Sequence, residues 1–196
     1  MRYTGAKWRI NRREQATVLG SSEKWKRRMS MPGQFPVLSK RPSEYAIQFR
    51  EKQKVKRMYG MSEAQFLRFY GLALKSSGNT STRLLQLLEL RVDNVLYKLG
   101  FANTRAMARQ FVTHGHITLN GKKHNIPSTI LKPGDEIMIK DGLMPKANEI
   151  LAQNKGYVVP AWIERLEKGG KVVAEPTRDQ MDSSIKERLI IELYSR

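Results

Sequence analysis

The chain of 196 residues contains no cysteine. Disulfide bonds and thiolate metal sites are therefore excluded, and nothing points to an oxidising compartment. No apolar run approaches the roughly 20 residues that cross a bilayer, so we expect no membrane partner. Acidic residues are scarce, with 18 Asp+Glu against 36 Lys+Arg. The chain therefore has little with which to neutralise its own positive charge.

The formal net charge of +18 indicates a polyanionic partner, and nucleic acid is the obvious one. Each phosphate that a cation neutralises also releases condensed counterions, which favours binding. Residues 1–60 hold 16 of the 36 basic residues and only 4 of the 18 acidic ones. The N-terminal third is therefore predicted to be the electrostatic anchor.

Residues 1–42 show little periodicity and are interrupted by glycine and proline. We interpret them as a basic, irregular arm that becomes ordered on its partner, with a short helix near residues 22–29. The candidate phosphate contacts in this arm are Arg2, Lys7, Arg12 and Arg13.

Two helices are predicted next, over residues 43–59 and 62–75. Ser43 and Ser62 are good N-cap residues, and Gly60 suits the end of the first helix. The first helix carries four cations within two turns, which we expect to clamp a second RNA segment: Lys52, Lys54, Lys56 and Arg57. An ordinary solvated helix face is the alternative for these four residues.

The apolar stripe of residues 82–99 predicts one long helix, and residues 104–113 predict another. Arg105 and Arg109 are four residues apart, so both guanidinium groups should point to the same side of that helix. Apolar and polar residues then alternate, and Asn120-Gly121 is a preferred hairpin turn. Lys122 and Lys123 follow it, which places two positive charges at an exposed hairpin tip.

The remaining signals are weaker. Residues 147–154 are predicted to form a short helix, and residues 136–140, 171–174 and 189–194 to form strands. The whole pattern predicts an α+β fold of three parts. These are the arm (residues 1–42), a helical domain (43–90, completed by 141–196) and an inserted domain of two helices and a small antiparallel sheet (91–140).

The three histidines do not make a catalytic or metal site, because no further ligands, nucleophile or orienting acid accompany them. We therefore predict no enzyme activity, no cofactor and no metal. His114 and His116 are expected to contact RNA phosphate or ribose, with Gln110 and Asn120 supplying hydrogen bonds; a merely structural turn is the alternative. Asp93 is interpreted as a surface residue of the long helix that pairs with a basic neighbour or contacts a partner.

Residues 91–121 read RVDNVLYKLGFANTRAMARQFVTHGHITLNG and resemble the alpha-L RNA-binding motif. That motif also occurs in pseudouridine synthases, some tRNA synthetases and a ribosome-rescue factor. Residues 2–7, 45–60 and 189–196 narrow the choice, because they resemble the bacterial-type family of the fourth protein of the small ribosomal subunit. The resemblance begins at residue 2, which leads us to expect no cleaved presequence.

This resemblance implies a non-catalytic protein that binds the 5′ domain of small-subunit rRNA and nucleates assembly. It implies contact with the fifth protein of the subunit, an influence on translational accuracy, and a place along the mRNA entry path. We expect a cytoplasmic ribosome, with an organellar ribosome as the alternative, and no homo-oligomer. An RNA-modifying enzyme and a free translation or rescue factor are the rival hypotheses.

One departure from the family concerns zinc. Many relatives carry four cysteines in the arm, whereas Trp8 and Asn11 stand here where a first pair is expected. The chain thus resembles the zinc-free branch. The arm must then be held by packing, by hydrogen bonds or by rRNA itself, and Trp8 and Trp25 are the candidates for packing.

Overall fold

The computed structural model describes residues 3, 5–20, 30–33, 42–154 and 156–195. It confirms the α+β class and divides the chain into two compact units. The first unit comprises residues 1–81 and 183–196, and the second comprises residues 82–182. The helix predicted near residues 22–29, Trp25 and Arg2 lie outside the described residues.

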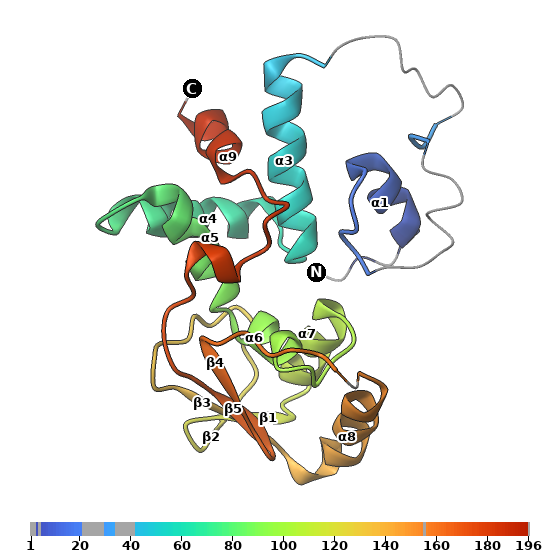
Figure 1. Ribbon diagram of the computed structural model, residues 1–196, viewed down its shortest axis with the longest axis vertical. Helices are drawn as coiled ribbons and strands as arrows, with labels where there is room; N and C mark the ends of the chain where they lie inside the picture. The colour runs from blue at the N-terminus through green and yellow to red at the C-terminus, as the bar shows by residue number, and fades with distance from the viewer. Residues whose placement is uncertain (1–2, 4, 21–29, 34–41, 155, 196) are drawn as a thin grey trace. The chain divides into compact units, whose positions relative to one another are not determined.

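The first unit is helical, and α5 (Thr80–Glu89) leads out of it into the second unit. Ser43 accepts a hydrogen bond from the Ala46 amide (3.2 Å), and Ser62 accepts one from the Gln65 amide (3.3 Å). Both predicted N-caps are therefore confirmed. The helices of this unit are α1 (Lys7–Glu14), α3 (Glu44–Met58), α4 (Glu63–Lys75) and α9 (Glu187–Tyr194) (Figure 1).

The arm is more regular than predicted, because residues 7–14 form α1. Asn11 is fully buried and ties the chain that follows the helix back onto it. Its Oδ1 accepts hydrogen bonds from the Val18 and Leu19 amides (3.2 and 2.9 Å), and its Nδ2 donates to the Gly20 carbonyl (3.0 Å). Trp8 is only half-buried, so the polar side chain at position 11 closes this loop.

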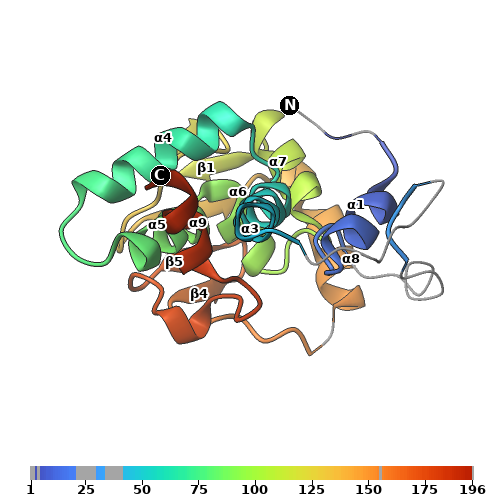
Figure 2. The ribbon, with the colours of Figure 1, turned by 90° about the horizontal axis from the view of Figure 1, so that it is seen from above.

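The strand predicted over residues 189–194 is wrong, since these residues belong to α9. The views in Figures 1 and 2 show α9 beside α3. Gln48 donates to Glu192 (3.2 Å), and the Tyr194 ring stacks on Tyr70 with centroids 4.6 Å apart. A short apolar run does not distinguish helix from strand, and packing against α3 decides the outcome here.

The second unit contains α6, α7, a sheet and α8. The helix predicted over residues 82–99 is in fact two helices, because Arg91 is extended (φ −67°, ψ 139°) and forms a bridge with Ile130. The remaining elements are α6 (Val92–Lys98), α7 (Arg105–Thr113), β1 (Ile117–Leu119), β2 (Lys122–His124), β3 (Glu136–Ile139), η1 (Asp141–Leu143), α8 (Met144–Gln153), β4 (Ile163–Leu166), β5 (Gly169–Val172) and η2 (Arg178–Gln180).

The sheet is antiparallel, with strand order β2-β1-β3-β5-β4. Asn120 (φ 49°) and Gly121 (φ 78°) make the predicted hairpin turn between β1 and β2. On the other side, β3 pairs with β5 in a register that places Met138 opposite Gly169. A Cβ at Gly169 would lie 2.0 Å from the Ile137 carbonyl oxygen, so the absence of a side chain permits this pairing.

The pairing of β3 with β5 corrects the predicted domain boundaries. Residues 141–182 were expected to complete the helical domain, but they extend the sheet and core of the second unit. Only residues 183–196 return to the first unit. The reason is hydrophobic: Trp162, Ile163 and Val172 are buried in the same core as Leu99 and Ile137.

In the described part of the chain, no helix is long and apolar enough to span a membrane. Nor do the described His, Asp and Glu residues gather into a group of three or more that could hold a metal ion.

Candidate nucleic-acid interface

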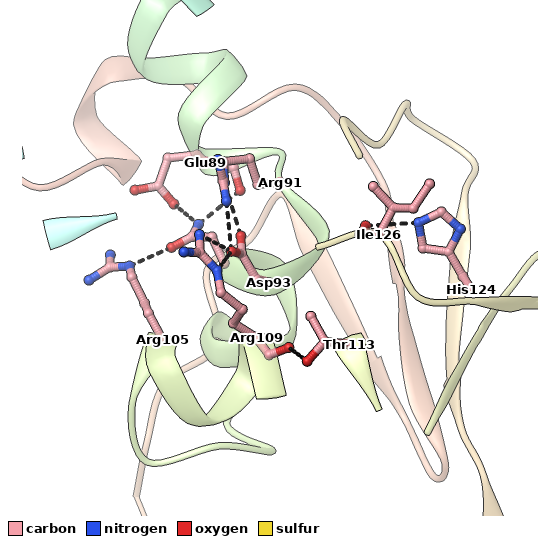
Figure 3. Close-up of polar contacts among 9 residues, drawn as sticks. Glu89, Arg91, Asp93, Arg105, Arg109, Thr113, His124 and Ile126 are labelled. Atoms are coloured by element: carbon pink, nitrogen blue, oxygen red, sulfur yellow. Dashed lines mark hydrogen bonds and ion pairs between the residues drawn. The ribbon is translucent and has the colours of Figure 1, made fainter. Parts of the chain in front are cut away.

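The predicted pair of arginines lies on α7, whose N-terminus is capped by Thr104. The Thr104 hydroxyl accepts a hydrogen bond from the Met107 amide (3.2 Å), which fixes the first turn. One turn apart, Arg105 and Arg109 both reach back to neighbouring residues in the first turn of α6 (Figure 3). The prediction that they share one side of the helix is confirmed.

Asp93 holds Arg109 and Arg91 together. Arg109 donates through Nε (2.9 Å) and Nη2 (2.7 Å) to Oδ2 of Asp93, and Arg91 donates to both carboxylate oxygens (3.0 and 2.7 Å). Asp93 is only 3% exposed and Arg91 only 1% exposed. The predicted basic partner of Asp93 is thus present, but the predicted position on a helix surface is wrong.

Asn94 holds Arg105 in the same way, through an amide instead of a carboxylate. Its Oδ1 accepts from Arg105 Nε (2.8 Å), and its Nδ2 donates to the backbone oxygen (2.8 Å) and the carboxylate (2.6 Å) of Glu89. The Arg105 guanidinium carbon also lies 4.8 Å from the centroid of the Tyr97 ring. Both guanidinium groups are therefore oriented before any ligand arrives, which reduces the entropic cost of binding.

A second group of polar side chains surrounds the end of α7 and the β1–β2 hairpin. Gln110 and His114 are exposed, His116 is half-buried, and the two imidazole rings lie 6.1 Å apart. Lys122 and Lys123 are exposed, as predicted. A Cβ at Gly115 would lie 3.0 Å from Cε of Lys123, so this lysine extends over the turn between the two histidines.

Asn120 was expected to bind RNA, but its side chain ties the hairpin turn to the start of β3. Its Nδ2 donates to Asp135 (2.9 Å), and its Oδ1 accepts from the Glu136 amide (2.9 Å). The third histidine, His124, points to the Ile126 carbonyl oxygen (2.9 Å) (Figure 3). The structure thus gives both side chains a role in holding local structure.

The cations predicted to clamp RNA from α3 do not form an open basic face. Lys52 and Lys54 are only 6% and 9% exposed; Lys52 donates to Glu63 and Lys54 to the Ser184 carbonyl oxygen. Lys56 donates to Glu63 as well (2.8 Å). Burial alone would raise the pKa of Glu63, but hydrogen bonds from the two lysines outweigh it and lower this pKa to about 2.

Arg57, the fourth of these cations, pairs with Glu14 at the end of α1, as does Arg50 (3.4 Å). Burial raises the pKa of Glu14, although both arginines act in the opposite direction. Each of these four α3 cations thus has a partner within the chain, and their contact with RNA stays a prediction. Glu63, Glu14 and the Ser184 carbonyl oxygen accept from charges that looked unpaired in the sequence.

The cations of the arm differ in whether they are exposed or bonded within the arm. Lys7 and Arg13 are exposed on α1. Arg12 donates to the Ser30 and Met31 carbonyl oxygens (2.9 and 3.4 Å), so it holds two parts of the arm together. Lys7 and Arg13 remain the candidates for phosphate contact among the described residues of the arm.

Two family models cover most of the chain. Residues 2–89 match the ribosomal protein S4/S9 N-terminal domain, and residues 90–137 match the S4 domain. A relative named small ribosomal subunit protein uS4, from Ruminiclostridium cellulolyticum, is 45% identical over 100% of this chain and 99% of its own. The chain belongs to the uS4 family. Relatives of the same name from Opitutus terrae (45% identity, 100% of this chain and 98% of the relative) and Dictyoglomus turgidum (44%, 100% and 99%) agree.

Members of the uS4 family are structural ribosomal proteins and not enzymes, which confirms the prediction of no catalytic activity. The match to the S4 domain ends at residue 137, whereas the second unit of the chain continues to residue 182. Sequence reasoning gave Asp93 a basic neighbour without identifying Arg91 and Arg109, and it missed Asn94 as the residue that holds Arg105. The available signal was the position of Asp93 and Asn94, one helix before the arginines and in the first turn after the extended Arg91.

Proposed function

We propose that this chain is a structural component of the small ribosomal subunit that binds rRNA, and that it acts in the ribosome. The observation that carries this proposal is the pair of guanidinium groups on α7, which Asp93 and Asn94 of α6 hold in place. Near the end of the same helix, Lys122 and Lys123 are exposed at the hairpin. Membership of the uS4 family supports the assignment.

The proposed mechanism is recognition of the shape of folded RNA. Duplex RNA offers phosphates and 2′-hydroxyls more than readable base edges, so a fixed set of cations selects a matching arrangement of helices. Arg105 and Arg109 would contact one stretch of backbone, and the hairpin lysines another. Gln110, His114 and His116 would add hydrogen bonds to phosphate or ribose.

The finer assignment rests on the family resemblance alone. We propose that the rRNA target is the 5′ domain and that binding nucleates assembly of the subunit. We also propose that the neighbours are the fifth protein of the subunit, at an interface that influences accuracy, and mRNA at the entry path. In this role the protein would act as a single copy, and it would stay in stoichiometric amount with salt-washed small subunits; loss under those conditions would indicate a transient factor.

The decisive experiment compares two sets of exposed lysines. Lys122→Ala with Lys123→Ala should weaken binding to a 5′-domain transcript and reduce the slope of log affinity against log salt by roughly 0.7–0.9 for each phosphate that the variant no longer neutralises. Lys168→Ala is the matched control, because Lys168 is also exposed in a hairpin turn but pairs with Asp141 (2.9 Å). Equal slopes for the double variant and the control would contradict the proposed interface.

A further inference from the structure

A corner of the second unit brings two tyrosines and two arginines together around Gly100. We call this set the Gly100 corner; it consists of Tyr97, Arg105, Tyr157 and Arg165. A Cβ at Gly100 (φ 85°) would lie 2.9 Å from Arg165 Nη2 and 3.5 Å from the Tyr157 ring. The side chains of Tyr157 and Arg165 therefore lie directly over this glycine, just beyond the end of α6.

The opposite side of the corner comes from α6 and α7. Tyr97, on α6, packs against the core with part of its ring, and the Arg105 guanidinium lies 4.8 Å from the ring centroid. The contacts around Gly100 bring Tyr157 and Arg165 to the end of α6, the helix that carries Tyr97. The corner thus combines two aromatic rings and two guanidinium groups, carried by α6, α7, β4 and the loop that precedes β4.

Core packing does not account for Tyr157 and Arg165. Tyr157 is 40% exposed, its neighbour Val158 is 84% exposed, and Arg165 is exposed. Within the described residues, the Tyr157 hydroxyl makes no hydrogen bond and Arg165 no ion pair. Burial raises the pKa of the Tyr157 hydroxyl, and Glu89 raises it further; the Glu89 carboxylate itself accepts a hydrogen bond from Asn94 (2.6 Å).

We propose that the Gly100 corner binds an unpaired nucleotide of the rRNA, with its base stacked on Tyr157 and its phosphate on Arg165. This inference rests on the proposed function and deepens it by naming a second contact and the RNA element it takes. Sequence-tolerant stacking on aromatic rings combined with guanidinium charge is how proteins hold single-stranded RNA. A base inside a duplex cannot stack in this way, so the nucleotide must come from a loop, bulge or junction.

The binding test uses the full chain and a small-subunit rRNA transcript. Removal of one stacking ring typically weakens binding roughly 5- to 150-fold, and we expect Tyr157→Ala to fall in that range. Tyr157→Phe retains the ring and should bind within about threefold of the unaltered chain. Val158→Ala removes an exposed aliphatic neighbour and should have no effect. Arg165→Gln should reduce the salt slope by about 0.7, the value for one single-strand phosphate.

Photo-crosslinking identifies the partner. A benzophenone side chain at position 157 should crosslink to one unpaired rRNA nucleotide in assembled subunits, whereas crosslinks to protein alone, or to none, would overturn the inference. So would unchanged affinity of Tyr157→Ala while the unaltered chain binds normally. If the unaltered chain itself fails to bind rRNA, the proposed function fails instead. Thermal unfolding of Tyr157→Phe and Tyr157→Ala checks that both variants fold.

Discussion

Asp93→Ala should strongly destabilise the second unit, because it removes a buried carboxylate that two guanidinium groups share. Arg91 is 1% exposed and would remain as a buried cation without its bidentate partner. Breaking a buried ion pair by removing one member costs about 3–5 kcal/mol. Arg109→Ala should cost less, since it leaves the pair of Asp93 and Arg91 intact.

Urea unfolding followed by Trp162 fluorescence would measure this loss, because Trp162 is buried in the core of the second unit. Phenylalanine at the other two tryptophans would make the signal specific. Asp141→Ala is the matched control: Asp141 is exposed and pairs with Lys168 at the surface, where solvent screens the pair, so its loss should change the free energy of unfolding little. If Asp93→Ala lowers the free energy of unfolding no more than Asp141→Ala, Asp93 is not the support of the two arginines that we describe.

Three further predictions concern the fold. Asn11→Ala deletes three hydrogen bonds to the chain after α1 and leaves buried backbone groups unpaired, so we expect a loss of about 1–3 kcal/mol and faster proteolysis of residues 15–20. The folded pKa of Glu63 lies below its ordinary value, so its pairing with the lysines stabilises the first unit above about pH 4.5, and this stabilisation is lost as the pH falls through about 2. Because Glu63 is partly exposed, the effect should be on the order of 1 kcal/mol, measured by hydrogen exchange in α3. Gly169→Ala would place a methyl group against the Ile137 backbone and should cost at least about 1–3 kcal/mol in thermal unfolding, whereas Gly142→Ala, which meets open space, should not.

Short-range signals in the sequence predicted much of the fold. The helices after Ser43 and Ser62 begin where their capping residues indicate, and the Asn120-Gly121 turn joins two strands. These features depend on residues only a few positions apart. The partners of β3 could not be predicted in this way, because β5 lies about thirty residues later and Gly169 gives no periodic signal. For the same reason the sheet appeared to end at residue 140.

In the candidate site, too, features set by neighbouring residues were predictable and contacts between distant residues were not. Helical spacing predicted that Arg105 and Arg109 share one side of α7, and the structure confirms it. The spacing could not reveal that Asp93 holds Arg109 and Asn94 holds Arg105, because these contacts depend on the turn between α6 and α7. Nor could it show that Glu63 faces Lys52, since the turn between α3 and α4 brings the first residue of α4 back to α3. The prediction made from the row of cations on α3 therefore overestimated the basic surface that is open to solvent.

The return of the last residues to the first unit has a consequence for synthesis on the ribosome. Everything that the second unit needs has been translated by residue 182, whereas α3 awaits the chain terminus for its contacts with Ser184 and Glu192. The later part of the chain can thus mature before the earlier part does. A nascent chain stalled before α9 would contain the complete sheet of the second unit, while the first unit would still lack its last helix. The usual order, in which the N-terminal part folds first, would then be reversed.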